Sequence, residues 1–503
     1  MISADIARRR PKSGIFRLAG LFLAIAMVVA ACSQSTGEDQ ADPAATPATQ
    51  ATPAEQPAPS DETGNGEPDG GEPDAGDPDA GEPDTGGTGN GEPGAASGGL
   101  VPAGPDTPGV SDDKVTISFI VTDTSAVAAA FGWETPDEGD RKAQIEALID
   151  HFNAEGGFAG RQIDAKVTVF NAITDGPVAE EALCNAITQD DKAFAVVMTG
   201  QLQENARPCY KNANTLMLDA TLYPVDNVGF EELAPYYWSP LLPSYDDLVG
   251  GLAAGLIADN WFDGATLGVI AIDSELNKRV YEQQFSPRLD AAGVEVASYN
   301  TIDPTDATSF NNDQLQAIIN FKEAGVDKVV AIGGSRLVSW FIETSITQNY
   351  APAYAVTSYD APEFNVFNFP EMMPGASGIS VLPGYDVEDD QYPFPANPAE
   401  QECAGIFSGA GLEFTERANI RTGLIFCDAL RLLAAASPHL SEVSAQGVSE
   451  AVWSLGDDFQ PASVYGVEFT EGSYAGGKVY RLFRFDAECE CMTLISGPKN
   501  FGE

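Results

Sequence analysis

The sequence predicts an α/β protein of two lobes, each built on a parallel central sheet. From about residue 112, short apolar segments rich in β-branched side chains alternate with longer segments whose apolar residues recur at helical spacing. Strands and helices that alternate in this way form parallel sheets covered by helices on both faces. About 400 residues follow position 112, which is too many for one hydrophobic core, so two lobes are expected.

The alternation predicts the elements one by one. The first strand is expected at 115–121, where VTISFIV is rich in β-branched residues. A helix is expected at 141–154, and its apolar side chains fall on one face: Ile145, Leu148, Ile149 and Phe152. The remaining strands are expected at 166–170, 193–198, 265–272, 294–299 and 328–332. The remaining helices are expected at 178–188, 248–260, 278–292, 310–324 and 338–348. Ligands bind such sheets at the carboxyl ends of the strands.

The charge of the chain excludes some partners. Its 503 residues include 75 acidic and 26 basic side chains, which give a formal net charge of −49. Such a charge repels phosphate, so no nucleic-acid partner is expected. It also disfavours an amphipathic helix lying on anionic lipid.

The N-terminus has the pattern of an export signal. Five basic residues lie between Arg8 and Arg17, and an apolar run of 14 residues follows at 18–31. This run is shorter than the roughly 20 residues that span a bilayer. It ends in Val-Ala-Ala before Cys32, which resembles the lipobox of bacterial lipoproteins, so Cys32 is the expected lipidation site and membrane anchor. The alternative is ordinary signal cleavage near Ala31 with an incidental cysteine.

Residues 33–111 are expected to form a disordered acidic tether. Gly, Pro, Ala, Thr, Asp and Glu dominate the segment, so it has too little apolar surface to offset the entropy of ordering. Five-residue repeats begin with GEPDG at 66–70. Proline and like charges extend such a chain, and a coil of this length reaches roughly 50 Å. The acids lack the ligand spacing of a calcium loop, so the expected role is a stalk.

The string FNAEGGFAGRQI at 152–163 carries a resemblance to a known family. It resembles the turn after the first long helix of type I periplasmic binding proteins of the branched-chain amino-acid class. There, an Asn ends the helix, and paired glycines, an apolar residue, a glycine and a basic residue lead into the second strand. Paired glycines suit this place because they end a helix and adopt positive φ. The resemblance extends over 113–497.

This resemblance implies two Rossmann-like lobes joined by a three-strand hinge, which ligand binding would stabilise in a closed form. The chain would leave lobe one near Ser239, return after a strand at 378–381, and cross a third time near 457–461. A strand at 479–485 would then close lobe two. The expected segments are a signal peptide at 1–32, the tether at 33–111, lobe one at 112–240 and 382–460, and lobe two at 241–381 and 461–503.

Six cysteines follow Cys32, and an exported chain is expected to form disulfides. The spacing of Cys184 and Cys209 is similar to a lobe-one disulfide of the branched-chain class. Cys403 and Cys427 form a second expected pair. Because six cysteines allow 15 connectivities, both pairs are hypotheses. Cys489 and Cys491 are only two residues apart, and a Cys-x-Cys metal or redox site is the alternative for them.

In the resembling family, the ligand lies between the lobes and is held by loops that follow strands. Small residues with free backbone N–H groups, such as those expected at Thr199 and Gly200, are suited to bind a carboxylate. The implied ligand-binding residues are Thr124, Trp133, Thr199, Gly200, Gln201, Ala220, Thr221, Tyr223, Asp273, Ser274, Ser335 and Asp360. Each has a structural alternative: the glycines before Ser335 could cap a helix, Trp133 could pack on a surface, and Asp273 and Asp360 could be solvated loop acids.

Two positions depart from the amino-acid-binding pattern. Thr199 and Gly200 stand where adjacent serines are often seen. Arg336 stands where an acid would be expected to bind the ligand's ammonium group. The ligand class therefore stays open among amino-acid-like compounds, amides, short peptides, aromatic acids and other small organic molecules.

The expected function is capture of a small organic solute outside the cytoplasm, by closure of the lobes, and delivery to an ABC-type permease. The alternative is a ligand-sensing or surface-interaction lipoprotein without a transport role. An enzyme is not expected, because the two histidines form no metal-binding pair and the sequence has no P-loop and no GxSxG motif. A hydrolase that uses only carboxylates is the remaining enzymatic alternative. No cofactor and no metal are expected.

Overall fold

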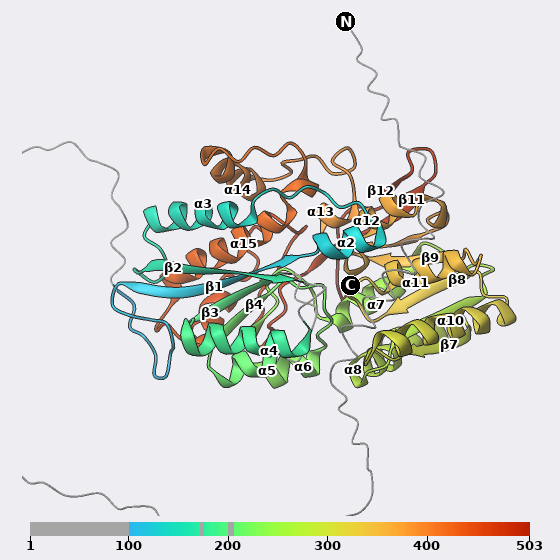
Figure 1. Cartoon of the computed structure of the whole chain (residues 1–503), viewed down its shortest axis with the longest axis horizontal. Coiled ribbons are helices and arrows are strands. Elements are labelled where there is room, and N and C mark those ends of the chain that lie inside the picture. The colour runs from blue at the N-terminus through green and yellow to red at the C-terminus, as the bar shows by residue number, and fades with distance from the viewer. Residues whose placement is uncertain (1–99, 172–175, 200–205, 503) are drawn as a thin grey trace, which may run out of the picture. The chain divides into compact units, whose positions relative to one another are not determined.

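Two sheets organise residues 100–171, 176–199 and 206–502, which are the residues that the computed structural model describes (Figure 1). The predicted signal peptide, Cys32, most of the tether, Gly200 and Gln201 lie outside them. No helix among the described residues is both long enough and apolar enough to cross a membrane.

The first sheet is entirely parallel, with the strand order β2-β1-β3-β4-β5. Its strands are β1 (Lys114–Asp123), β2 (Gln162–Asn171), β3 (Ala195–Thr199), β4 (Leu216–Asp219) and β5 (Tyr237–Trp238). Side chains of β1 alternate between two cores, as a period of two requires. Ile117 and Phe119 enter one hydrophobic cluster, whereas Ile120 enters another.

Helices cover both faces of this sheet (Figure 1). One face carries α3 (Arg141–Ala154), α14 (Pro398–Gly409) and α15 (Arg421–Ala436), with α16 (Ala445–Trp453) packed on α15. The other carries α4 (Pro177–Asn185), the π-helical turn η1 (Ala186–Asp190), α5 (Arg207–Asn212) and α6 (Asn227–Leu233). The rings of Phe119 and Phe426 meet edge to face at 5.8 Å and join the sheet to α15.

The second sheet has the order β12-β11-β10-β9-β8-β6-β7, and β13 pairs with β11. Neighbours from β7 to β10 are parallel, whereas β11 runs antiparallel to β10, β12 and β13. The strands are β6 (Leu267–Ile272), β7 (Val296–Ile302), β8 (Lys328–Ile332), β9 (Ala353–Thr357), β10 (Ser377–Ser380), β11 (Val479–Asp486), β12 (Cys491–Leu494) and β13 (Lys499–Asn500).

Alternate side chains of β6 again divide between two cores. Val269 packs in a cluster with α7, α8, η2 and α9, whereas Ile270 packs with α10, α11 and α12. These helices are α7 (Tyr245–Ala258), α8 (Glu275–Val280), η2 (Tyr281–Phe285), α9 (Ser286–Ala292), α10 (Ala307–Ala324), α11 (Leu337–Thr347) and α12 (Pro362–Asn368). The predicted α/β class with parallel sheets is confirmed.

The chain passes between the two sheets three times. The passages lie between β5 and α7, between β10 and α14, and between α16 and β11. The first and third run side by side, because the backbone N–H of Ser239 donates to Tyr474 O and its carbonyl accepts from Gly476 N, both at 2.9 Å. The second contains the short helix α13 (Pro383–Asp386).

The turn after α3 explains the glycine-rich string of the sequence. Gly157 has a φ of +70°, and a Cβ there would lie 1.9 Å from the carbonyl oxygen of Arg161, so only glycine fits. Asn153 holds the following strand through Ile163, accepting from its N–H at 2.7 Å and donating to its carbonyl at 3.1 Å. The buried guanidinium of Arg161 donates to the carbonyls of Val101, Ala159 and Ser111.

The described cysteines form three disulfides. Cys184–Cys209 connects α4 to α5, and Cys403–Cys427 connects α14 to α15. These are the two pairs expected from the sequence. Cys489–Cys491 spans the turn between β11 and β12, so these two cysteines pair with each other.

Candidate functional site

The loop after β4 contains Ala220, Thr221 and Tyr223 and is held by a buried ion pair. Arg207 Nη2 lies 2.8 Å from Asp219 Oδ2, and both side chains are almost fully buried. Asp219 Oδ1 accepts a hydrogen bond from the backbone N–H of Thr221 at 2.6 Å. The guanidinium of Arg207 lies 5.6 Å from the centre of the Tyr223 ring. Interactions within the first half of the molecule, by which we mean the first sheet and the helices that cover it, therefore fix this loop.

The same loop directly contacts the second half of the molecule, by which we mean the second sheet and the helices that cover it. The backbone N–H of Ser335 donates to the carbonyl of Leu222 at 2.9 Å. A few residues on, Arg279 Nη2 lies 2.6 Å from Asp226 Oδ2, whose side chain is buried. The loop after β4 thereby contacts the loop after β8 and the helix α8, which follows β6.

Several of the predicted ligand-binding side chains make local hydrogen bonds. Thr199 Oγ1 donates to a backbone carbonyl of β1 at 3.1 Å. Ser274 is the N-cap of α8 and accepts from the backbone N–H of Asn277 at 3.2 Å. Asp360 accepts from the N–H and hydroxyl of Thr357 at 3.0 and 3.1 Å, while burial raises the pKa of Asp360 to about 6.

Other predicted residues are placed without such bonds. Thr124 precedes α2 (Ser125–Phe131) and makes no side-chain hydrogen bond to that helix. The side chain of Asp273 is exposed. Ser335 Oγ is buried and has no hydrogen-bond partner within the described part of the chain.

Trp133 belongs to an aromatic cluster that joins the segment after α2 to the second half. Its ring stacks on Phe131 with centroids 4.8 Å apart and meets Trp340 at 5.0 Å and Phe364 at 5.2 Å. Its indole Nε1 donates to Glu343 Oε1 at 2.7 Å. The interpretation of Trp133 as a packing residue thus has direct support.

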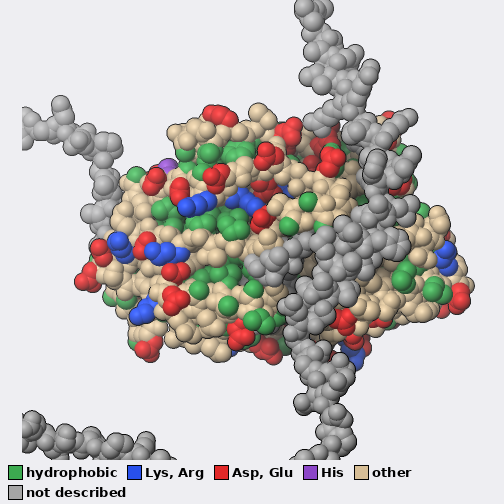
Figure 2. Space-filling view, in the orientation of Figure 1, with side chains coloured by type: hydrophobic (Ala, Val, Ile, Leu, Met, Phe, Trp, Pro, Cys, Tyr) green, Lys and Arg blue, Asp and Glu red, His purple; other side chains and the backbone are tan. Residues whose placement is uncertain are grey.

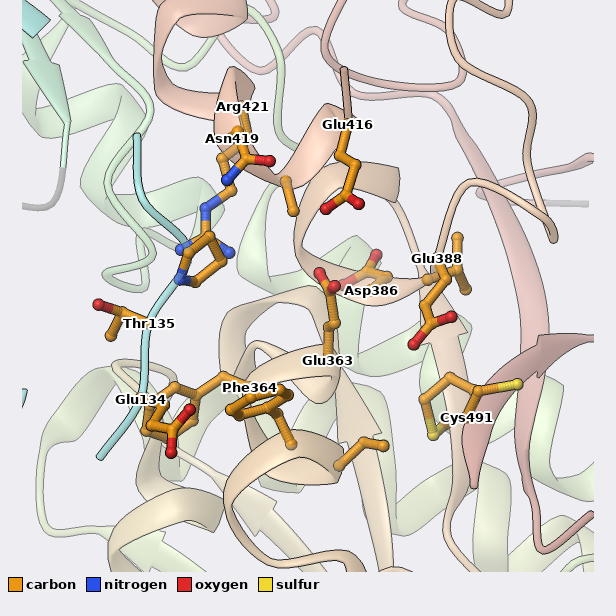
Figure 3. Close-up of a pocket in the computed structure, with 16 residues that line it drawn as sticks. Glu134, Thr135, Glu363, Phe364, Asp386, Glu388, Glu416, Asn419, Arg421 and Cys491 are labelled. Atoms are coloured by element: carbon orange, nitrogen blue, oxygen red, sulfur yellow. The ribbon is translucent and has the colours of Figure 1, made fainter. Parts of the chain in front are cut away.

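A cavity of about 180 Å³ opens beside this cluster (Figure 3). Five segments line it: 134–136 after α2, 363–367 in α12, 386–388 after β10, 416–421 before and at the start of α15, and 491–492 in β12. The cavity is thus lined by residues from helices and strands of both halves. None of the predicted ligand-binding residues that the structure describes lines it.

Two carboxyl groups that line the cavity each have a buried oxygen without a hydrogen-bond partner among the described residues. Asp386 is fully buried, and its Oδ2 accepts hydrogen bonds from the hydroxyls of Ser358 and Ser380 at 2.6 and 2.7 Å. Neither Asp386 Oδ1 nor Glu363 Oε2 has a hydrogen-bond partner among the described residues. Burial raises the pKa of each carboxyl group to about 7.

Arg421 is the basic residue among those that line the cavity, and it has partners of its own. Its Nε lies 3.0 Å from Glu138 Oε1, and its guanidinium lies 4.2 Å from the centre of the Tyr385 ring. Burial alone would lower the pKa of Arg421, but the negative charge of Glu138 and its other neighbours raises that pKa. Arg421 is therefore a cation already balanced by a carboxylate.

Arg336, the departure noted in the sequence, does not line the cavity. It has a φ of +61°, and its guanidinium lies 5.2 Å from the centre of the Phe364 ring. Burial lowers the pKa of Arg336, and the nearby charge of Arg421 lowers it further.

The charged residues of the surface are distributed differently from those of the cavity. Acidic and basic side chains are interspersed over the face seen in Figure 2. The cavity instead gathers five acids, Glu134, Glu363, Asp386, Glu388 and Glu416, around the paired Arg421. Within the described part of the chain, no group of three or more His, Cys, Asp or Glu side chains has the arrangement of a metal site.

Solved structures share this arrangement of sheets. A possible leucine/isoleucine/valine-binding protein from Rhodopirellula baltica gives a TM-score of 0.54 at 12% identity over 76% of this chain and 96% of that chain. The branched-chain amino acid transporter substrate binding protein of Streptococcus pneumoniae, in complex with isoleucine, gives 0.52 at 13% over 76% and 100%. This chain has the type I periplasmic binding protein fold.

A third structure with this fold contains a different ligand. The solute binding protein of an ABC transporter from R. palustris, in complex with 4-hydroxybenzoate, gives a TM-score of 0.52 at 14% identity over 77% of this chain and 97% of that chain. No protein-family model matches the sequence, and no curated protein does.

Two of the acids that line the cavity could have been predicted from the sequence of this periplasmic binding protein fold. Asp386 and Glu388 follow β10, and the rule that ligands bind at the carboxyl ends of strands applies to that strand as well. The family resemblance directed attention to the loops after earlier strands. Glu363 carries a weaker signal, because it is one acid in a chain that has many.

Proposed function

We propose that this protein captures a small organic solute outside the cytoplasm, between its two lobes, and delivers it to an ABC-type permease. The observation that carries the proposal is the cavity, which is lined from both halves and contains buried carboxyl oxygens without partners. Buried polar groups normally have hydrogen-bond partners, so such oxygens favour a site that binds a solute. The fold supports the same conclusion, because the matching structures include transporter substrate binding proteins.

Export is part of the proposal. The basic and apolar segments before Cys32 favour secretion, and lipid at Cys32 would hold the protein on the outer face of the membrane. Disulfides such as Cys184–Cys209 and Cys403–Cys427 are typical of oxidising compartments and therefore support an extracytoplasmic location.

Solute capture would act through the three passages between the sheets. We take lobe one as 112–240 and 382–460, and lobe two as 241–381 and 461–503. When the lobes separate, direct contacts such as Ser335 to Leu222 and Arg279 to Asp226 must break. A solute that touches both lobes adds contacts found only in the closed form and so shifts the population toward it. The permease would then recognise this form.

The test combines binding with uptake. The full chain, purified with detergent, is titrated with amino acids, amides, aromatic acids, sugars and amines while its thermal unfolding is followed. A ligand at 100 times its dissociation constant should add roughly 2.7 kcal/mol of stability. Cells that lack the gene should then lose uptake of the same labelled solute. If a solute binds but uptake is unchanged, the delivery step is wrong and a sensing role replaces it. If no class binds, the proposal of solute capture is wrong.

A further inference from the structure

We infer that the solute is a compact organic cation, an amine or a guanidine, bound by the carboxyl groups of Glu363 and Asp386. This inference rests on the proposed function, because it names the class of solute that the cavity between the halves would hold.

The charge of the cavity selects the sign of its occupant. Among the residues that the structure describes, five carboxyl groups and one guanidinium line it. That guanidinium, on Arg421, is already paired with Glu138 at 3.0 Å. An anionic solute would therefore meet an excess of like charge, whereas a cation would meet the carboxyl groups of Glu363 and Asp386, each with one oxygen that lacks a partner among the described residues. In a buried site of low dielectric constant, this difference is larger than at the surface.

Asp386 has the geometry of a built binding group. Its Oδ2 is fixed by the hydroxyls of Ser358 and Ser380 and by the backbone N–H groups of Val381 and Leu382. These bonds set the orientation of the carboxyl group, which is fully buried and lines the cavity. Its second oxygen, Oδ1, has no partner in the described part of the chain. A preorganised acceptor is thus ready for a donor from the solute.

Glu363 lies in the first turn of α12 (Figure 3). Figure 3 shows its carboxyl group in the middle of the lining residues, beside that of Asp386. Burial raises the pKa of Glu363. The positive charge of Arg421 lowers this pKa, but by less than burial raises it. Ionised Glu363 therefore lacks sufficient compensation when the cavity holds no cation. A bound cation would supply the charge and the N–H donors together.

The remaining wall fixes the size and the apolar part of the solute. Phe364, Val366, Val387 and Met492 bring hydrocarbon surface to the cavity. Its volume of about 180 Å³ is below the roughly 300–1,000 Å³ of sites for drug-sized ligands, so the occupant is small. An ammonium or guanidinium group on a short carbon skeleton satisfies both conditions. Its N–H groups can reach the two acids while its carbon atoms contact the apolar wall.

The experiment is a calorimetric titration of the full chain in detergent at pH 8 with 1,4-diaminobutane and agmatine. Leucine and 4-hydroxybenzoate serve as zwitterionic and anionic comparison ligands. We expect a cation to bind most tightly, and Glu363→Gln to weaken it by at least ~10-fold, because a hydrogen bond to a charged group is lost. Glu371→Gln is the matched control: it removes the same charge at an exposed position of the same half and should leave affinity unchanged.

Thermal unfolding of each variant separates loss of binding from loss of folding. Asp386→Asn replaces a carboxyl group that accepts several buried hydrogen bonds with an amide, so its effect on affinity counts only if that variant remains folded. Glu363→Gln provides the test in either case. If leucine or 4-hydroxybenzoate binds more tightly than both cations, or if Glu363→Gln leaves cation affinity unchanged, this inference is wrong and solute capture stands. If none of the solute classes binds, the proposed function fails as well.

Discussion

Trp133 Nε1 donates a hydrogen bond of 2.7 Å to Glu343 Oε1, although 210 residues separate the two in the chain. Trp133 follows α2 in the first half, and Glu343 lies on α11 in the second. A hydrogen bond to a charged acceptor contributes more than a neutral one, and this one joins α11 to the residue just before Glu134, which lines the cavity.

A double-mutant cycle should measure this bond. We expect Trp133→Phe and Glu343→Ala to lower the free energy of unfolding individually, with a coupling energy of about 1 kcal/mol between them. Phenylalanine preserves much of the contact with Phe131 and Trp340, so the coupling isolates the indole N–H. Urea unfolding of the four proteins gives the value. Additive effects of the two substitutions, within about 0.3 kcal/mol, would show that the bond contributes nothing.

Two adjacent glycines in the turn after α3 offer a matched comparison. Gly156 and Gly157 both have positive φ, of +113° and +70°. A Cβ at Gly156 would meet nothing within 4 Å, whereas at Gly157 it would collide with the carbonyl of Arg161. We therefore expect Gly157→Ala to lower the free energy of unfolding by at least ~2 kcal/mol more than Gly156→Ala. Equal losses, measured by thermal unfolding, would contradict the steric account.

The pH dependence of stability should reveal Glu363. Its pKa is raised from 4.5 to about 7 in the folded protein, so the folded state retains a proton that the unfolded state has released. This group therefore lowers stability as pH rises from about 4.5 to about 7, and its penalty is complete above that range. Arg421, Glu388, Asp389 and Asp386 are the charged groups around it.

The Glu363→Gln variant removes this penalty. Relative to the unmodified chain without ligand, we expect it to be more stable at pH 8 by about 1–3 kcal/mol and little changed near pH 4.5. Urea unfolding at the two pH values measures the difference, with Glu371→Gln as the control. A gain of equal size at both pH values would mean that titration of Glu363 is not its cause.

The disulfides should differ in their contribution to stability. Cys403 and Cys427 close a loop with a sequence separation of 24, whereas Cys489 and Cys491 are separated by 2. The loss of chain entropy in the unfolded state grows with loop length. We expect Cys403→Ser with Cys427→Ser to cost roughly 3–4 kcal/mol, and Cys489→Ser with Cys491→Ser about half as much or less. Unfolding of both double variants in urea checks the order, which the entropic account requires.

The sequence predicts best those elements whose apolar residues recur without interruption. The helix expected at 141–154 and the strand expected at 328–332 have those bounds in α3 and β8, because both have clear apolar periodicity. β2 begins at Gln162 rather than at the expected 166, because polar residues such as Asp164 interrupt the pattern. α12 and α13 were not predicted, since helices of seven and four residues are too short to show a period.

The cavity could not be predicted from the sequence for a different reason. Its lining comes from five segments between 134 and 492, and only tertiary packing brings them together. Residue type alone also does not distinguish a structural role from ligand binding. Ser274 caps a helix, and Asp360 accepts a hydrogen bond from Thr357. Whether these side chains also reach a solute stays a prediction.

The carbonyls bound by Arg161 have a mechanical consequence. Val101 and Ser111 stand where the chain enters the first half, and Arg161 secures both. This entry lies at the end of the first sheet that faces away from the second sheet (Figure 1). If Cys32 carries the proposed lipid anchor, tension from the membrane would therefore reach the first half at this outer end rather than at the three passages between the sheets. In the proposed capture cycle, the first half would then keep its position relative to the anchor while the second half moves.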